Sequence, residues 1–322
     1  MRGVRSLGLL FLFVGAQVVA LLLALPYRSA GLASTSNPNS PLDPVFIIVA
    51  VVVAPLILLF FIARAQGALA AVRFVILVAI AGALYYTLQA TFSLIVPAPF
   101  YFRPETVALV GDFSIPLAGA VASALFLALL MEPQWYVVDS VGFLAAGSLI
   151  ALLGISFGIL PSFILLIALA VYDAIAVYRT KHMVALADVA TDLKLPILMV
   201  MPGSGGFDYT KRGRIRDQQA QPVEEREALF MGLGDVVIPG TLVTSAFVWL
   251  PTTSVLGVGA NLWVALAVLA GAVVGYGILM RLVARGTAQA GLPLLNGGAL
   301  LGYIFGYLLL FHNVGLGLTV SL

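Results

Sequence analysis

Residues 157–178 read FGILPSFILLIALAVYDAIAVY, an apolar stretch in which Asp173 is the one charged side chain. A hydrocarbon core about 30 Å thick is crossed by a helix of roughly 20 apolar residues, so this stretch predicts a transmembrane helix. A charged group in the middle of such a helix costs at least about 2.5 kcal/mol and needs a reason to be there. The stretch therefore predicts a membrane protein and marks Asp173 as a candidate functional residue.

The composition of the whole chain agrees with this prediction. Of 322 residues, 62% are hydrophobic and 9% are charged, whereas a soluble domain carries about 25% charged residues. We expect an all-α fold with nine transmembrane helices in a single membrane-embedded domain over 1–322. The first apolar run is longer than the roughly 7–15 residues of a signal peptide, so we interpret it as a retained span. The expected spans are about 7–25, 44–63, 71–96, 105–130, 136–153, 157–178, 229–250, 256–281 and 291–312.

The positions of lysine and arginine orient these spans. With nine helices, the side of the N-terminus carries all but Arg28 and Arg103 of the 16 basic residues. Cytoplasmic loops of membrane proteins carry the excess of basic residues. We therefore expect a cytoplasmic N-terminus, an outside C-terminus and a long cytoplasmic loop at 179–228 in a multi-pass protein of a cell membrane.

Other chemistry-bearing residues are sparse. The chain has no cysteine, and His182 and His312 lie far apart in sequence, so we expect neither a metal site nor a cofactor. Asp112 and Asp139 fall within about two turns of the ends of their predicted helices, where water and headgroups reach them. We interpret both as structural.

Asp173 and Asp235 differ from these two acids in depth. Asp173 precedes Arg179, at the cytoplasmic end of its helix, by six residues, and Asp235 follows Glu227 by eight. At 1.5 Å per residue these separations are about 9 Å and 12 Å. The two helices run in opposite directions, so both carboxylates are predicted at nearly the same depth, within reach of cytoplasmic water.

Such a pair has a defined chemistry. Two carboxylates within a few ångströms do not both ionise easily, and they share a proton. The ionised member can take a proton from water while the protonated member polarises a carbonyl, which is the division of labour in aspartic proteases. Gly232 and Gly234 precede Asp235 and allow another main chain to approach it closely, although glycine is also common at ordinary helix contacts.

A third feature is the segment Ala290-Gly291-Leu292-Pro293-Leu294-Leu295-Asn296-Gly297-Gly298. Proline lacks an N–H group, and the flanking glycines favour irregular backbone. In a membrane, non-helical backbone occurs where it is buried in protein or lines a water-filled cavity. The segment is consistent either with a simple kinked helix start or with the wall of a site.

Taken together, Tyr172-Asp173, Gly232-Leu233-Gly234-Asp235 and Pro293-Leu294-Leu295 resemble the presenilin and signal peptide peptidase family of intramembrane aspartyl proteases. The order of the motifs and the intervening loop match this family over essentially the whole chain. The resemblance implies a presenilin-like fold and a catalytic dyad. Two residues depart from the family motif, since Leu294 replaces alanine and Asn296 replaces a second proline. The implied catalytic residues are Asp173 and Asp235, and the implied substrate-binding residues are Tyr172, Gly232, Leu233, Gly234, Pro293, Leu294 and Leu295.

The resemblance also implies a substrate and an orientation. The enzyme would hydrolyse peptide bonds within transmembrane helices of other proteins, after local unwinding and pairing of the extended segment as a β-strand. We hypothesise that the end of the 179–228 loop and the chain near Pro293 offer the pairing edge. The charge bias favours substrates with their N-termini outside. By resemblance the chain is a compact prokaryotic, archaeal-type homologue, and we expect it to act in lipid without accessory subunits or nucleic acid, in an oligomeric state that the sequence leaves open.

Two alternatives to this hypothesis remain at the level of sequence. A secondary transporter could bind protons or sodium at paired intramembrane aspartates, although transporters commonly carry two interrupted helices in corresponding positions of inverted repeats. Here the Gly/Pro interruption at 290–298 has no evident counterpart in the first half of the chain. A family member that kept the fold and acts as a binding or chaperone protein is the other alternative.

Overall fold

The computed structural model describes residues 2–33, 35, 37–40, 42–47, 49, 69–95, 114–180, 196, 198–203, 207, 226–284 and 289–318. Among these residues, long helices dominate, and two short antiparallel hairpins accompany them. The helices are α1 (Arg2–Ser29), α3 (Leu69–Ile95), α4 (Ser114–Met131), α5 (Trp135–Ser156), α6 (Ile159–Ile175), the π-helical turn η1 (Ala176–Thr180), α9 (Leu233–Trp249), α10 (Ala260–Val283) and α11 (Leu292–Phe311). The strands are β1 (Leu198–Pro202), β2 (Ala228–Gly232), β3 (Ser254–Val255) and β4 (Val258–Gly259).

Seven of the described helices are long and apolar enough to cross a membrane, and α9 is a shorter apolar helix of 17 residues. These eight helices coincide with eight of the nine expected spans. The expected span at 44–63 lies largely outside the described residues, so the total of nine stays a prediction. The break expected between the spans 105–130 and 136–153 is present, because α4 ends at Met131 and α5 begins at Trp135.

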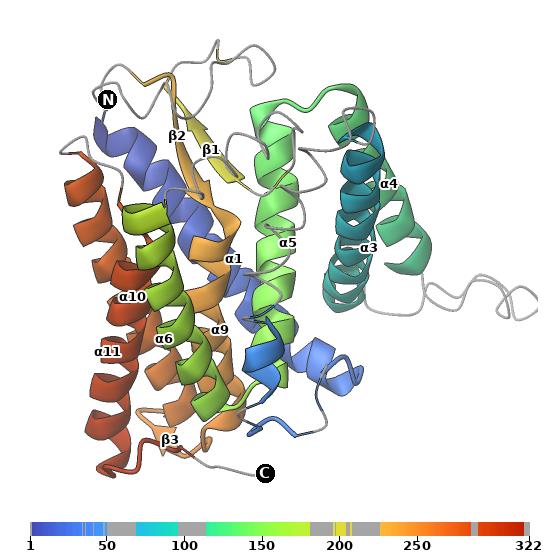
Figure 1. The fold of residues 1–322 in the computed structure, drawn as a ribbon. Helices are drawn as coiled ribbons and strands as arrows, with labels where there is room; N and C mark the ends of the chain where they lie inside the picture. The colour runs from blue at the N-terminus through green and yellow to red at the C-terminus, as the bar shows by residue number, and fades with distance from the viewer. Residues whose placement is uncertain are drawn as a thin grey trace, which may run out of the picture.

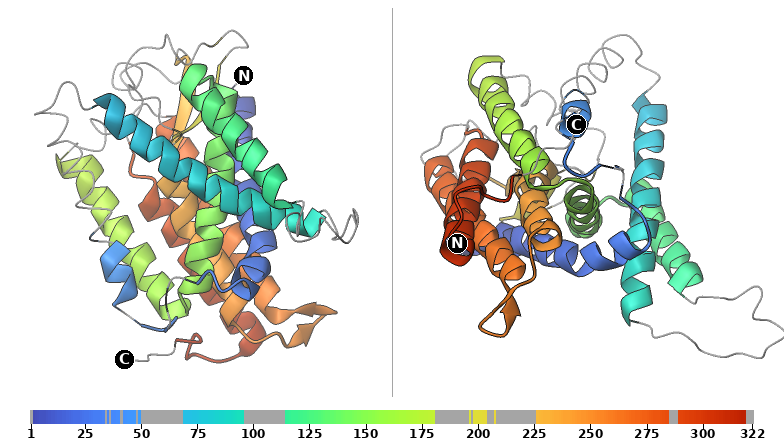
Figure 2. Two further views of the ribbon diagram at one scale, coloured as in Figure 1. Left: turned by 90° about the vertical axis from the view of Figure 1, so that its right-hand side faces the viewer. Right: turned by 90° about the horizontal axis from the view of Figure 1, so that it is seen from below.

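The helices form two groups. In Figures 1 and 2, α6, α9, α10 and α11 stand together on one side, α1 and α5 lie in the middle, and α3 and α4 stand on the other side. The main hydrophobic core joins α1, α5, α6, α9, α10 and α11. A second core joins α3 and α4 to the start of α5 and to the β1–β2 hairpin. The end of α6 and the starts of α9 and α11 lie at the same end of the molecule as β1 and β2 (Figure 1).

The contact between α10 and α11 is made by main chain against main chain. A Cβ atom added at Gly271 would collide with the carbonyl oxygen of Gly298, and one added at Gly275 would collide with that of Leu294. A Cβ atom at Gly302 would likewise collide with the carbonyl oxygen of Ala267. Small residues at helix interfaces allow this close approach in membranes, where dispersion contacts drive helix association.

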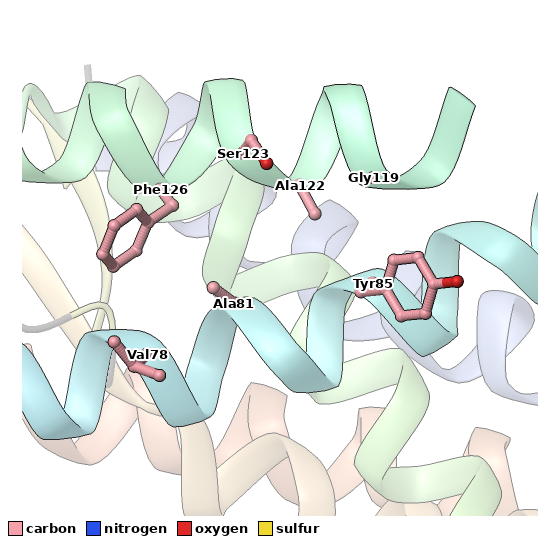
Figure 3. A pocket seen from close by; sticks show the side chains of 7 residues that line it. All are labelled: Val78, Ala81, Tyr85, Gly119, Ala122, Ser123 and Phe126. Carbon is pink, nitrogen blue, oxygen red and sulfur yellow. The ribbon is translucent and has the colours of Figure 1, made fainter. Parts of the chain in front are cut away.

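The contact between α3 and α4 is more open. A hollow of about 250 Å³ lies along part of the contact between the two helices (Figure 3). Small side chains make room for it, with Tyr85 near one end and Phe126 near the other. Its lining consists of Val78, Ala81, Tyr85, Gly119, Ala122, Ser123 and Phe126.

Two short segments that we expected to be helical are extended. Residues 229–232, expected at the start of the seventh span, belong to β2, which pairs antiparallel with β1 from Leu198↔Gly232 to Pro202↔Ala228. Residues 256–259, expected at the start of the eighth span, form the turn and second strand of the β3–β4 hairpin. Leu256 and Gly257 take positive φ angles in that turn. A short apolar run has no periodicity that separates strand from helix, which explains both errors.

Candidate active site

Asp173 lies on the last turns of α6 and is buried, with 4% of its surface exposed. Its Oδ2 atom accepts a hydrogen bond of 3.1 Å from the Leu292 N–H, and the carboxylate also accepts one from the Gly291 N–H. The first four N–H groups of a helix have no partner within the helix. The start of α11 therefore supplies main-chain donors to a carboxylate on α6.

Asp235 lies in the first turn of α9, directly after β2. Its carboxylate accepts a hydrogen bond from the Gly232 N–H and is partly exposed. A carboxylate in the first turn of a helix also interacts favourably with the helix dipole. At 17 residues α9 is about 26 Å long, which is less than the roughly 30 Å of a hydrocarbon core. Extended backbone at membrane depth occurs where it is buried in protein or lines a wet cavity, so β2 is consistent with water near Asp235.

The two carboxylates interact electrostatically with each other. The main chain at Gly291 lies against both of them. Its N–H group donates to Asp173, and a Cβ atom added at this glycine would lie 3.0 Å from Oδ1 of Asp235. Two neighbouring carboxylates that share a proton can activate water and polarise a carbonyl at once.

The residues expected around the dyad fall into several environments. Tyr172 is partly exposed and interacts electrostatically with its neighbour Asp173. At Gly232, an added Cβ atom would lie 3.4 Å from Oδ2 of Asp235, whereas at Gly234 it would meet no atom within 4 Å. Leu233 is partly buried and packs against Gly142 of α5.

At the start of α11, the residues that contact the dyad directly precede the predicted motif Pro293-Leu294-Leu295. Pro293 occupies the second position of α11, where its missing N–H is tolerated. Leu294 is partly buried with its carbonyl against Gly275, and Leu295 is fully buried in the main core. The atoms that reach the aspartates belong to Gly291 and Leu292, which the sequence reasoning did not single out. A donor role of the main chain leaves no mark in side-chain identity, apart from the glycine itself.

Asp139 was expected where water and headgroups reach it, but the structure buries it, with 6% of its surface exposed, against a partner that the sequence did not indicate. The side chain is buried in α5, and its Oδ1 atom accepts a hydrogen bond of 2.7 Å from the Val200 N–H in β1. The acid therefore binds the outer edge of the β1–β2 hairpin to α5. Asp112 lies outside the described residues.

This anchor also fixes which side of the hairpin faces the candidate site. Because Val200 directs its N–H away from β2, its partner Phe230 directs its main-chain groups away from β1. Alternation places the main-chain groups of Ala228 and Gly232 on that same side. The Gly232 N–H on this side donates to Asp235, so this edge of β2 leads to the carboxylate pair.

Comparison with known proteins gives a consistent result. The family model described as "Signal-peptide peptidase, presenilin aspartyl protease" matches residues 10–312. Two solved structures of a presenilin family intramembrane aspartate protease, in C222 and P2 space groups, are similar to the chain. The first has 28% sequence identity and a TM-score of 0.65, covering 95% of this chain and 99% of that one. The second has 31% identity and a TM-score of 0.60, covering 94% and 97%. No curated protein matches the chain.

Proposed function

The chain belongs to the signal-peptide peptidase and presenilin family of aspartyl proteases, and from that premise we propose that Asp173 and Asp235 are its catalytic dyad. The protein is a multi-pass, mostly helical intramembrane aspartic protease with a presenilin-like fold. The observation that carries the proposed dyad is the position of Gly291, whose N–H donates to Asp173 and where an added Cβ atom would lie 3.0 Å from Oδ1 of Asp235. Because the chain belongs to this protease family, the hypothesis of a secondary transporter is dropped.

The dyad acts on water and on the scissile carbonyl. One carboxylate is ionised and takes a proton from the attacking water, while the protonated carboxyl donates a hydrogen bond to the carbonyl oxygen. Attack gives a tetrahedral intermediate, and a proton passes to the leaving nitrogen as the C–N bond breaks. Three main-chain N–H groups, at Gly232, Gly291 and Leu292, hold the two side chains in place for these steps.

The substrate is a transmembrane helix of another protein, which must unwind before it is cut. Unwinding exposes N–H and C=O groups that need partners where water is scarce. We propose that the unwound segment pairs along the edge of β2 that faces away from β1, at the end of the 179–228 loop. The hydrogen bond between Asp139 and Val200 supports this choice, because α5 covers the other edge of the hairpin. A β-strand added at the edge of β2 would lead toward Asp235.

The flanking motif residues complete the proposed substrate site. Tyr172 and Gly234 are at least partly exposed next to the dyad, and Leu233, Pro293 and Leu294 are partly buried near it. Leu295 is fully buried, so its contribution to substrate binding is to support the main chain at the start of α11.

The charge distribution supports an orientation for protein and substrate. We propose that the N-terminus is cytoplasmic and the C-terminus outside, in a prokaryotic cell membrane, because all but two of the 16 basic residues then face the cytoplasm. Substrates then have their N-termini outside, and the chain acts without accessory subunits. A tag at either terminus, probed with a membrane-impermeant reagent in intact cells, tests the orientation.

The decisive experiment is a cleavage assay with purified protein in detergent. A single-span, N-out substrate is incubated with the parent, Asp173→Asn and Asp235→Asn. We expect cleavage by the parent and a loss of at least about a thousandfold in each variant, since dyad members act as a unit. Cleavage by either folded variant at a rate close to that of the parent would exclude that residue from the dyad. A parent that binds substrate without cutting it would favour the binding-protein alternative.

A further inference from the structure

Polar contacts at three positions of α6 and η1 join these elements to the start of α11 and to the residues before it. Along α6 and η1 they involve positions 166, 173 and 178, and along the other chain they involve positions 296, 292 and 290. The residue numbers increase along α6 and η1 while those of their partners decrease, as expected for neighbouring antiparallel segments. The middle contact is the hydrogen bond from the Leu292 N–H to Asp173, so the two outer contacts bracket it.

Asn296 makes the inner contact. Its side chain is fully buried, and its Nδ2 donates a hydrogen bond of 2.8 Å to the Leu166 carbonyl oxygen. Its Oδ1 is buried without a hydrogen-bond partner in the part of the chain that the structure describes. Burying an amide is unfavourable unless it is hydrogen-bonded, so an apolar side chain would suit the core better. Asn296 follows Leu292 by four residues and therefore lies on the same face of α11.

Tyr178 makes the outer contact. Its hydroxyl donates to Oε1 of Gln289 at 2.9 Å and accepts from the Ala290 N–H at 3.3 Å. The hydroxyl thus engages two consecutive residues that directly precede Gly291. Tyr178 is 57% exposed and lies on the π-helical turn η1, five residues after Asp173. π-Helical turns are rare and frequently occur at functional sites.

We propose that Tyr178 and Asn296 are positioning residues that hold Gly291 and Leu292 against Asp173 from either side. The proposal rests on the catalytic role of Asp173. The N–H groups that reach this carboxylate belong to the start of α11, where helix geometry gives them no partner of their own. Anchors before and after these two residues fix the donors on the carboxylate. Asn296 stands where the family motif has a second proline. This anchor is therefore a departure of this chain from the motif.

The test compares Tyr178→Phe and Asn296→Leu with two matched controls. Tyr136→Phe removes the hydroxyl of another exposed tyrosine, on α5. Asn261→Leu removes a buried amide whose Nδ2 donates at 2.6 Å to the Phe247 carbonyl oxygen, on α10. For each protein we would measure kcat, KM, the thermal midpoint and the affinity of a peptide inhibitor whose hydroxyl mimics the tetrahedral intermediate.

Positioning residues predict a specific kinetic signature. Displaced reacting groups lose up to about a hundredfold in rate per ångström, so we expect kcat to fall about 3- to 10-fold in Tyr178→Phe and about 10- to 100-fold in Asn296→Leu. The KM should stay constant, and affinity for the inhibitor should fall by the same factor as kcat. Tyr136→Phe should resemble the parent. Asn261→Leu should change the thermal midpoint while kcat and inhibitor affinity stay constant.

Other results would overturn the proposal. Parental kcat and inhibitor affinity in Tyr178→Phe would refute its role, and this variant decides the matter even if Asn296→Leu does not fold. The same outcome in a folded Asn296→Leu would refute the role of Asn296. Failure of the dyad itself is separable, because Asp173→Asn would then still cleave. An inactive Asp173→Asn beside fully active Tyr178→Phe and Asn296→Leu would refute the positioning proposal alone.

Discussion

Gly275 of α10 provides a test of how closely the catalytic geometry depends on packing far from the dyad. An alanine Cβ at this position would lie 2.9 Å from the carbonyl carbon of Leu294 and 3.2 Å from Cα of Leu295, and closer still to the Leu294 carbonyl oxygen. Main chain cannot rotate away as a side chain can. An ordinary contact between carbon atoms is about 3.5–4.0 Å long, so the start of α11 must withdraw from α10 by about 1 Å.

Two free energies follow from this displacement. Overpacking costs about 1–3 kcal/mol, whereas alanine gains about 1 kcal/mol over glycine in a helix interior. Gly275→Ala should therefore lower the free energy of unfolding by about 0–2 kcal/mol, from the difference of these terms. The same movement displaces the Leu292 N–H relative to Asp173. A shift of 1 Å in a positioning group reduces the rate about a hundredfold. This factor corresponds to about 2.7 kcal/mol of activation free energy, which exceeds the expected loss of folding free energy.

The matched control lies two residues away on the same helix. Gly277 is exposed, and a Cβ atom added there meets no atom within 4 Å. We would measure kcat on a single-span substrate and unfolding in denaturant for the parent, Gly275→Ala and Gly277→Ala. We expect Gly277→Ala to retain parental kcat. A folded Gly275→Ala with parental kcat would refute the argument that the α10–α11 contact sets the position of the donors.

Three further predictions follow from the site. Gly291→Val should reduce kcat at least about tenfold, because even a Cβ atom lies 3.0 Å from Oδ1 of Asp235 and the γ-carbons need more room; unchanged kcat in the folded variant would contradict the contact. Asp139→Leu should leave the Val200 N–H without its acceptor, destabilising the hairpin by about 1–3 kcal/mol; hydrogen exchange at Val200 should accelerate, and unchanged exchange would show that another group holds β1. The pH–rate profile should be bell-shaped, because activity needs one shared proton on the dyad; rate falls at low pH when both carboxyls are protonated and at high pH when both are ionised, and a profile that rises to a plateau would contradict the shared proton.

Most of the helical fold could be predicted from hydropathy alone. Runs such as 71–96 and 291–312 are long and apolar, so helices α3 and α11 appear within a few residues of the expected bounds. The errors fall where the apolar pattern continues across a change of structure. At 228–232 the sequence Ala-Leu-Phe-Met-Gly is as apolar as α9, and only pairing with a distant segment makes it a strand.

In the candidate site, too, single residues could be predicted from the sequence and contacts between distant segments could not. Asp173 and Asp235 could be singled out because an acid in an apolar helix is energetically expensive, and this signal lies in single residues. The hydrogen bond from Val200 to Asp139 spans 61 positions, and the donation from Leu292 to Asp173 spans 119. Main-chain donors carry no residue identity, so no pattern in the sequence points to them. Gly291 was visible as part of a glycine- and proline-rich string, and only the structure assigns its contacts.

The glycine-lined contact between α10 and α11 has a consequence for how the enzyme responds to its bilayer. Where backbones touch, no rotamers can rearrange when lipid composition or thickness changes, so the donors at the head of α11 keep their spacing. The hollow between α3 and α4 is different, because it is lined by side chains, which can change rotamer (Figure 3). Sensitivity to the surrounding lipid should therefore arise at the α3–α4 side, while the packing of α10 against α11 stays nearly constant from one membrane to another.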